Sequence, residues 1–175
     1  TTIGEGHDVS AMAGFSMQDW KMETTGLDGL YFASDNIRTL NGAGTISNQA
    51  VNRTDEHSML SYFGRISYNY KGRYLAEANV RADGSSRFGA DNRFGYFPSA
   101  SAAWRFSDES FANGLNFLTD GKLRVSVGQT GNEAIPNYVQ GGEFAIGTNY
   151  LTLSGASPTV MPNQALKWEV TTQYN

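Results

Sequence analysis

Few residues in this sequence could support chemistry at a metal or nucleophilic centre. Cysteine is absent, and His7 and His57 are the only histidines. A zinc site of the usual kind needs more His or Cys ligands at closer spacing, so we expect two surface histidines and no metal or cofactor. Asp83-Gly84-Ser85-Ser86 has the composition of a turn and lacks the further oxygen ligands of a calcium loop. The lack of cysteine also excludes a small extracellular fold held by disulfides.

Charged residues of both signs recur at alternate positions in several segments. They are Arg65, Glu77, Arg81, Asp83, Arg105, Arg124 and Glu169. No two carboxylates are isolated from neighbouring bases, so the sequence offers no pair for general acid–base catalysis. We therefore predict that the chain is not an enzyme.

The composition narrows the fold class that must position these residues. The net charge of −4 and the pI near 5.1 have the wrong sign for a nucleic-acid partner. The 20 glycines would destabilise helices by roughly 1 kcal/mol each, and 13% aromatic residues are too many for a disordered chain. No stretch reaches the ~20 apolar residues of a membrane-spanning helix. We therefore predict an all-β chain.

Alternation of apolar and polar residues predicts about six strands. The segments are 7–17, 59–70, 74–83, 97–106, 122–129 and 166–175. In the last of them, Trp168 and Val170 fall on the apolar face. The predicted connections are a tight turn at 71–73, a polar segment at 107–121, and the longer loops 19–58, 84–96 and 130–165.

The order of these connections predicts an antiparallel up-and-down meander with every long loop on one side. Outer-membrane barrels have this asymmetry. Aromatic residues at both ends of the strands agree with two interfacial belts, Tyr68, Tyr70 and Tyr74 beside the tight turn and Phe94, Tyr96 and Phe97 at the opposite end. A soluble sandwich, whose apolar face would turn towards a second sheet, is the alternative. Because small membrane barrels have about eight strands, we expect further strands to flank this chain at both ends.

Seven motifs, in sequence order, resemble the SusC/RagA family of TonB-dependent outer-membrane transporters from Bacteroidetes. They are Leu60-Ser61-Tyr62-Phe63-Gly64-Arg65, Arg73-Tyr74-Leu75, Arg81-Ala82-Asp83-Gly84-Ser85-Ser86-Arg87-Phe88-Gly89, Phe97-Pro98-Ser99 with Ala103-Trp104, Leu123-Arg124-Val125-Ser126, Gly128-Gln129-Thr130-Gly131-Asn132, and Leu166-Lys167-Trp168-Glu169. The resemblance covers residues 58–175 well and the first 57 residues only in general character.

The resemblance implies that the 175 residues form part of a 22-stranded transmembrane β-barrel with a plug, in the bacterial outer membrane. Its implied function is active import of oligosaccharides or peptides, and its implied partners are a SusD-like surface lipoprotein, TonB, the remaining barrel strands and plug, the cargo and the lipid bilayer. No plug domain is recognisable in this sequence, nor is the N-terminal region through which TonB would act. The alternative is a soluble or cell-surface β-sandwich that binds carbohydrate or serves adhesion.

In a barrel, the seven charged residues given above would face the lumen. Side chains of both signs could pair across neighbouring strands as a structural lattice, or they could line a substrate path. Exposed aromatic residues in the predicted loops are candidates for contact with cargo or partner: Trp20, Tyr31, Phe32, Tyr138, Phe144 and Tyr150. Stacking on sugar rings, packing against a lipoprotein lid and ordinary packing within the loop all remain open.

Overall fold

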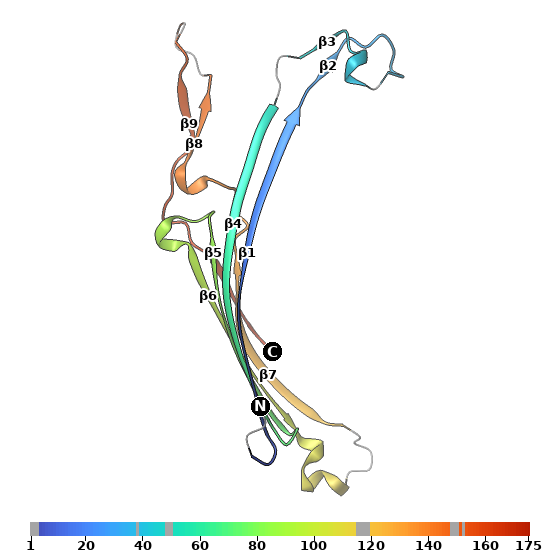
Figure 1. Cartoon of the computed structure of the whole chain (residues 1–175), viewed down its shortest axis with the longest axis vertical. Coiled ribbons are helices and arrows are strands. Elements are labelled where there is room, and N and C mark those ends of the chain that lie inside the picture. Colours follow the sequence, from blue (N-terminus) through green and yellow to red (C-terminus); the bar gives the residue numbers. More distant parts are fainter. Residues whose placement is uncertain (1–3, 38, 48–50, 115–119, 148–150, 152) are drawn as a thin grey trace. The chain divides into compact units, whose positions relative to one another are not determined.

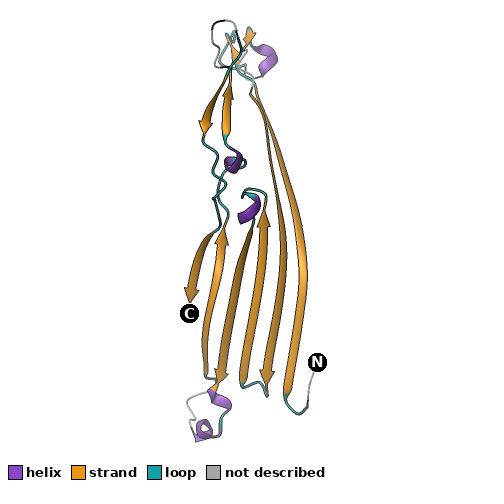
Figure 2. Cartoon of the chain, turned by 90° about the vertical axis from the view of Figure 1, so that its left-hand side faces the viewer, coloured by secondary structure: helices purple, strands orange, loops and turns teal. Residues whose placement is uncertain are grey.

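The computed structural model describes residues 4–37, 39–47, 51–114, 120–147, 151 and 153–175. Within them, six strands form one sheet in the order β1-β4-β5-β6-β7-β10 (Figures 1 and 2). The strands are β1 (His7–Gly26), β4 (Val51–Tyr70), β5 (Tyr74–Ser85), β6 (Phe94–Arg105), β7 (Lys122–Asn132) and β10 (Glu169–Tyr174). Each registered pair from β4 to β10 is antiparallel. The predicted all-β, up-and-down meander is confirmed.

The chain divides into two compact units. The smaller unit, Asp19–His57, contains the end of β1, the start of β4, the two-stranded pair of β2 (Gly29–Leu30) with β3 (Thr45–Ile46), and the short 3-10 helix η1 (Leu40–Gly42). In it, the Lys21 ammonium lies 2.8 Å from a carboxylate oxygen of Glu23 and 3.5 Å from one of Glu56. These carboxylates, Glu23 first, raise the pKa of Lys21. The rings of Trp20 and His57 lie 5.0 Å apart.

The predicted loop 19–58 is wrong at both ends, because β1 continues to Gly26 and β4 begins at Val51. Trp20, which we expected in that loop, lies in β1. Most residues of these strand extensions are exposed. A strand that buries neither face has no need to alternate apolar and polar residues, so its period is invisible in the sequence.

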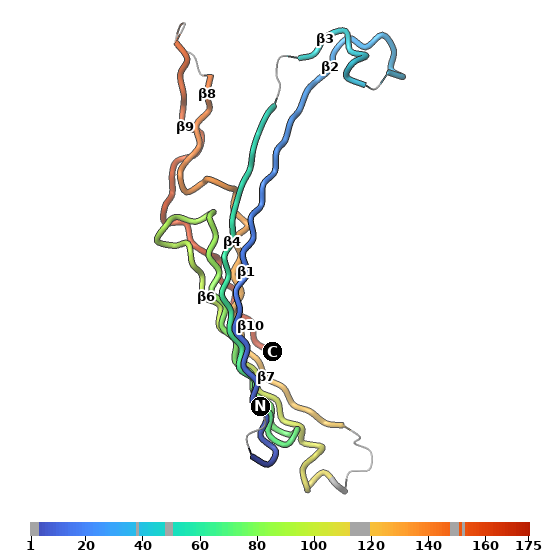
Figure 3. Tube along the Cα trace, viewed as in Figure 1, coloured from blue at the N-terminus to red at the C-terminus, as the bar shows by residue number. Residues whose placement is uncertain are grey.

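The larger unit, 1–18 with 58–175, contains the rest of the sheet, whose path is traced in Figure 3. Residues 71–73 join β4 to β5 in a tight turn, with positive φ at Lys71 (52°) and Gly72 (72°) and a 3.0 Å hydrogen bond from Arg73 N to the Tyr70 carbonyl. Glycine suits this turn because it adopts positive φ without strain. The connection 106–121, with η3 (Phe106–Asp108) and η4 (Ser110–Gly114), is at the same end of the sheet, here called the turn end.

The other two connections of the larger unit leave the opposite end of the sheet, here called the loop end. Residues 86–93, with η2 (Ala90–Asn92), join β5 to β6. Residues 133–168 join β7 to β10 and contain η5 (Val139–Gly141) and a hairpin of β8 (Glu143–Ile146) with β9 (Ala156–Val160). The longest connection, 133–168, therefore leaves the loop end, but the expected sorting of all connections by length is wrong, because 106–121 at the turn end has 16 residues and 86–93 at the loop end has 8.

Several predicted strand limits at the loop end need correction. The loop predicted at 84–96 is only 86–93, the loop predicted at 130–165 starts after Asn132 and contains the β8–β9 hairpin, and the last strand begins at Glu169 instead of 166. The strand predicted at 97–106 is shifted to Phe94–Arg105. The turn predicted at Asp83-Gly84-Ser85-Ser86 is wrong for its first three residues, which belong to β5. Asp83 pairs with Ser61 of β4 and Gly95 of β6, so the neighbouring strands hold this polar sequence in extended form.

The strand register separates two faces of the sheet. On the apolar face, large side chains are exposed: Tyr62, Ile66, Tyr68, Tyr74, Val80, Phe94, Tyr96, Trp104, Leu123, Val125, Val127, Val170 and Tyr174. The polar face carries the alternate residues, among them Arg65, Glu77, Ser101 and Ser126. Only four hydrophobic side chains are buried among the described residues, namely Phe88, Phe97, Ala112 and Trp168. A domain that folds around an internal core would bury far more.

Phe97 and Trp168 do not lie on the apolar face that the alternation predicted for Trp168 and the aromatic belt predicted for Phe97. Their rings pack together on the polar side at the loop end, with centroids 5.3 Å apart and exposures of 7% and 8%. Of the other residues predicted for the aromatic belts, four are exposed on the apolar face: Tyr68, Tyr74, Phe94 and Tyr96. Trp168 precedes β10, so the alternation of that strand does not apply to it.

The described part of the chain contains no helix that is long and apolar enough to cross a membrane.

Candidate functional site

All seven charged residues singled out in the sequence share the polar face by register. Glu77 pairs with Ser67 on one side and Ser101 on the other, and Ser101 pairs in turn with Ser126. Every second residue along each strand lies on this same face. By the register, these residues include Arg65, Arg81, Asp83, Arg105, Arg124 and Glu169. The sheet therefore collects on one surface charges that are spread over more than a hundred residues of sequence.

Arg65 and Glu77 are connected through an amide at the centre of the polar face. Arg65 Nε donates to Asn79 Oδ1 at 2.8 Å, and Asn79 Nδ2 donates to Glu77 Oε1 at 2.9 Å. Arg65 Nε also lies 3.7 Å from Glu77 Oε1. The two charges belong to adjacent strands and are half exposed, so this network stabilises the sheet only modestly.

Arg81 and Asp83 form a tighter pair nearer the loop end. Arg81 Nε lies 2.7 and 2.8 Å from the two carboxylate oxygens of Asp83, and its Nη2 donates to Ser61 Oγ at 3.0 Å. Ser61 is 1% exposed and the Asp83 side chain 12%. Arg81 therefore supplies donors to two buried acceptors.

Replacing Arg81 with methionine is expected to destabilise the folded protein by about 1–3 kcal/mol, because Asp83 and Ser61 lose donors that water cannot fully replace. The matched control is Arg105→Met. Arg105 is 40% exposed and lies 3.8 Å from both Asp108 and Asp120, so the expected loss is below about 1 kcal/mol. Urea denaturation of the folded protein measures both losses. Equal losses for the two variants would contradict the assignment.

Open hollows lie along the polar face. One of about 510 Å³ is lined by Asp8, Ser10, Ser67, Glu77, Lys122 and Arg124, among others. Another of about 690 Å³ is lined mainly by amide and hydroxyl side chains, including Asn79, Ser99, Ser126, Thr130 and Gln173. Hollows on the opposite face are apolar, and one of them is lined by Tyr68, Tyr74, Trp104, Leu123 and Val125. The polar hollows thus present hydrogen-bonding groups, whereas the apolar hollow is lined mainly by aromatic and aliphatic side chains.

The turn end is organised around Glu109. Its Oε1 accepts hydrogen bonds from the Tyr74 hydroxyl at 2.7 Å and the Trp104 indole at 3.3 Å, and Arg73 Nη1 lies 3.5 Å from Oε2. These hydrogen bonds, followed by the Arg73 charge, hold the pKa of Glu109 below its usual value. Glu109 thus ties the connection 106–121 to the aromatic side chains at this end of the sheet.

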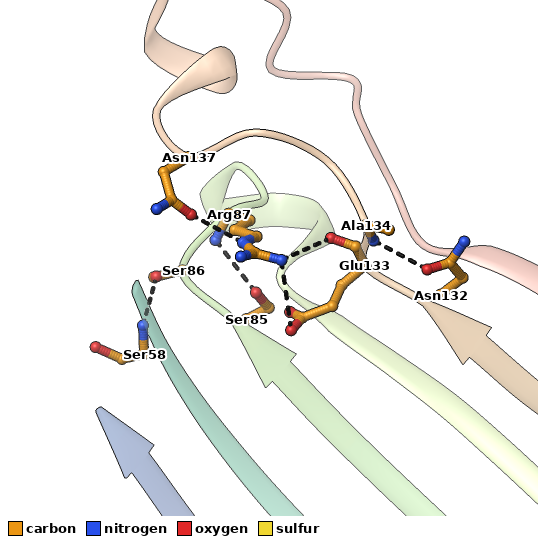
Figure 4. Close-up of polar contacts among 8 residues, drawn as sticks. All are labelled: Ser58, Ser85, Ser86, Arg87, Asn132, Glu133, Ala134 and Asn137. Carbon is orange, nitrogen blue, oxygen red and sulfur yellow. Dashed lines mark hydrogen bonds and ion pairs between the residues drawn. The ribbon is translucent and has the colours of Figure 1, made fainter. Parts of the chain in front are cut away.

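A cluster at the loop end was missed by the sequence analysis. Phe88, Phe97 and Trp168 form its core, with ring centroids of Phe88 and Trp168 5.0 Å apart and the Trp168 indole donating to the Arg93 carbonyl at 3.0 Å. Beside it, Arg87 contacts Asn137 and Glu133 (Figure 4). We call Phe88, Phe97 and Trp168 the rim cluster. Its residues occur in motifs of the family resemblance, but nothing in their spacing indicated that they meet.

The candidate loop aromatics are divided between the two units of the chain. Trp20, Tyr31 and Phe32 belong to the smaller unit, and Tyr138 and Phe144 belong to the larger one. Phe32 packs so close to Gly29 that a Cβ there would lie 2.8 Å from its ring. Tyr31 is 82% exposed and Phe144 62%. Tyr150 lies outside the described residues.

The described residues contain no group of three or more His, Cys, Asp or Glu side chains that could hold a metal ion. His7 Nδ1 lies 2.8 Å from the Tyr68 hydroxyl, and the His57 ring lies 5.0 Å from the Trp20 ring. The two histidines are far apart in the sequence and belong to different units. The six-stranded sheet thus has one apolar face and one charged face.

Comparison with known proteins agrees with this geometry. A family model described as "TonB dependent receptor-like, beta-barrel" matches residues 3–175. TonB-dependent receptor P39 of Formosa agariphila is 37% identical over 175 residues, which are 99% of this chain and 17% of that protein. TonB-dependent receptor SusC of Bacteroides thetaiotaomicron is 41% identical over 129 residues, 68% of this chain and 13% of that protein. The chain thus spans less than a fifth of the length of these relatives.

Solved structures give the same result. The RagAB peptide importer in its "closed-closed" state matches with a TM-score of 0.86 and 29% identity, over 99% of this chain and 19% of that one. The "open-open" state of the same importer matches with a TM-score of 0.84 over the same shares. The six-stranded sheet and its connections therefore correspond to part of the fold of a known importer.

Proposed function

The chain belongs to the β-barrel family of TonB-dependent receptors, and from this we propose that it forms part of the wall and outer loops of a SusC/RagA-type transporter. Receptors of this family are outer-membrane proteins and transporters, not enzymes. The proposed function is active import of oligosaccharides or peptides across the outer membrane. The proposed partners are a SusD-like surface lipoprotein, TonB acting through another region of the protein, and the remaining barrel strands and plug.

The exposed apolar face is the observation that carries this proposal. Ile66 is 59% exposed, Val80 51% and Val125 57%, although all three lie in the middle of the sheet. Strands β5, β6 and β7 have 12, 12 and 11 residues, and a tilted membrane strand needs about 9–11. Lipid would cover this face, and small residues such as Ala76 and Ala78 would not have to pack closely against a second protein layer.

The polar face supports a water-filled interior. Its charges of both signs are paired along and across strands, and its hollows are lined by amides and hydroxyls. In a barrel this face would look into the lumen, where the same side chains can contact a plug or passing cargo. The edge strands β1 and β10 would pair with further strands, because hydrocarbon cannot satisfy unpaired backbone groups.

The alternative of a soluble or cell-surface β-sandwich is not favoured. In a sandwich Val80 and Trp104 would be covered by a second layer, but they are 51% and 37% exposed, and the described residues provide no sheet that packs on them. The carbohydrate-binding or adhesive function was inferred from the sandwich fold, so it is not favoured either.

The proposed function also specifies the class of cargo, which is oligosaccharides or peptides. The solved neighbours are described as a peptide importer, and a curated relative is SusC. Uptake of fluorescently labelled oligopeptides and oligosaccharides by cells with and without the parent protein tests it. We expect uptake of one class to require both the parent protein and TonB. Unchanged uptake of both classes in cells without the parent protein would contradict the proposed function.

A further inference from the structure

An apolar groove runs along β6 on the face of the sheet that the proposed function turns towards lipid. Its part at the turn end has a volume of about 340 Å³, with the rings of Tyr74 and Trp104 in its lining. A second apolar hollow of about 340 Å³ continues it towards the middle of the sheet, and the two share Ala102 and Val125. From Trp104 to Ala100 the groove extends roughly 13 Å along β6. Its length and lining suit one hydrocarbon chain.

The Lys71 ammonium lies near the turn end of this groove and is held in place there. The Lys71 backbone N–H donates to the Gly6 carbonyl at 2.7 Å, and a Cβ at Gly6 would lie 2.5 Å from Lys71 Cγ. The ammonium is 5.3 Å from the centre of the Tyr70 ring, which stacks on Tyr74 of the groove with centroids 6.2 Å apart. Lys71 is exposed and forms no ion pair with any of the described residues. Its positive charge is therefore available to a ligand.

Arg73 is the second cation at this end of the groove. Its Nη1 lies 3.5 Å from Glu109 Oε2, and Glu109 Oε1 accepts hydrogen bonds from Tyr74 and Trp104, which both line the groove. A guanidinium has five N–H donors, so this ion pair leaves several of them for a ligand. The charges of Arg73 and Glu109 cancel, and Lys71 adds a net positive charge.

The other carboxylates near this end belong with the polar face. Asp108 and Asp120 each lie 3.8 Å from Arg105, which the register places on that face. The charge beside the apolar groove therefore remains positive.

The aromatic side chains indicate at which depth the two cations would lie. Tyr and Trp rings of membrane proteins lie at the level of the lipid headgroups, and long basic side chains beside them extend towards headgroup phosphates. Tyr74 and Trp104 pair across β5 and β6, so they mark one level of the sheet. Lys71 and Arg73 lie at this level or beyond it, and the rest of the groove runs from it towards the sheet centre.

We propose that the groove and these two cations form a binding site for one glycerophospholipid with a net negative headgroup. Its phosphate binds the Lys71 ammonium and the Arg73 guanidinium, and one of its acyl chains lies in the groove. A zwitterionic lipid would bring its own positive charge close to Lys71. Short turns of outer-membrane barrels face the periplasm, so this lipid belongs to the periplasmic leaflet. The inference rests on the proposed function, which places the apolar face in lipid, and goes beyond it by assigning one class of lipid.

The test uses the full-length parent transporter in detergent, with phosphatidylglycerol and phosphatidylethanolamine of identical acyl chains as probes. Native mass spectrometry measures the dissociation constant of the first lipid bound. We expect the unaltered protein to bind phosphatidylglycerol at least about fivefold more tightly, which corresponds to about 1 kcal/mol for one basic residue near an anionic headgroup. Lys71→Gln is expected to remove most of this preference. The matched control is Lys122→Gln, at the same end but on the polar face, which should keep it.

A second pair of variants tests the groove. Ala102→Leu fills the groove where its two parts meet, and it is expected to weaken the binding of both lipids about fivefold, because part of the acyl chain loses its buried contact. The ratio of the two affinities should stay unchanged. The control is Ala13→Leu, at an exposed alanine of β1 that lines neither part of the groove, and it should alter neither affinity.

The outcomes separate this site from the proposed function. Equal affinities of the unaltered protein for the two lipids, or an undiminished preference in Lys71→Gln, overturn the headgroup site, and unchanged affinities in Ala102→Leu overturn the groove. A fluorophore on Ala78→Cys, in a parent otherwise free of cysteine, reports on the membrane itself. Quenching there by nitroxide-labelled lipid of either headgroup, without a headgroup preference in binding, overturns the lipid site alone. Absence of that quenching contradicts the proposed function together with the site.

Discussion

Replacement of Trp168 with alanine is expected to lower the free energy of unfolding of the parent barrel by about 3–5 kcal/mol, the range for truncating a buried aromatic side chain. Trp168 is 8% exposed and contacts both other rings of the rim cluster, with centroid distances of 5.0 Å to Phe88 and 5.3 Å to Phe97. Its indole also satisfies the Arg93 carbonyl. Urea denaturation in lipid vesicles, followed by the gel mobility of the folded barrel, measures the loss.

Two variants control for this prediction. Trp168→Phe keeps a ring in the cluster but loses the hydrogen bond to Arg93, so an intermediate loss is expected. Tyr174→Ala removes an aromatic side chain that is 79% exposed on the apolar face, and it should cost much less. A Trp168→Ala barrel as stable as the Tyr174→Ala barrel would contradict the buried position of Trp168.

Arginine placed on the apolar face should destabilise the barrel strongly, and arginine on the polar face should not. Ala100 and Ser101 are adjacent small residues near the middle of β6, and they lie on opposite faces. Ala100 lines an apolar hollow with Ala102, Val125 and Val127, and Ser101 pairs with Glu77. For Ala100→Arg we expect a loss of about 2–4 kcal/mol, the cost of arginine at the bilayer midplane.

Ser101→Arg is the matched control, with an expected change below about 1 kcal/mol because the new charge lies beside Glu77 in water. Both variants are compared by urea denaturation in the same lipid vesicles. Similar losses for Ala100→Arg and Ser101→Arg, or a larger loss for Ser101→Arg, would contradict the assignment of the faces.

The strand order and the faces could be predicted because one physical cause, an apolar surface on one side only, produces a period of two in the sequence. That cause operates for Tyr62, Ile66 and Val80, which alternate with Phe63, Arg65 and Arg81. Beyond the centre of the sheet, the strands no longer have an apolar surface on one side only. The extensions of β1 and β4 in the smaller unit are mostly exposed on both faces, and the sequence analysis therefore assigned them to a loop.

The rim cluster could not be predicted because its contacts join residues distant in sequence. Arg87 meets partners 46 and 50 residues away, and Trp168 donates to a carbonyl 75 residues away. Trp168 was assigned to the wrong environment by alternation, and Phe97 by its expected place in an aromatic belt. Small neighbours explain why their rings pack on the other side: a Cβ at Gly95 would lie 2.5 Å from the Phe97 ring and 2.9 Å from that of Trp168.

Site-directed fluorescence quenching along β5 tests most directly that this sheet separates lipid from an aqueous interior. This chain contributes no cysteine, so once any cysteines elsewhere in the parent barrel are replaced with serine, single cysteines at Ala76, Glu77, Ala78 and Asn79 can each carry one fluorophore. In vesicles containing nitroxide-labelled lipid, we expect strong quenching at Ala76 and Ala78 and weak quenching at Glu77 and Asn79. Equal quenching at all four positions, or the opposite alternation, would contradict a membrane wall with its charged face turned inward.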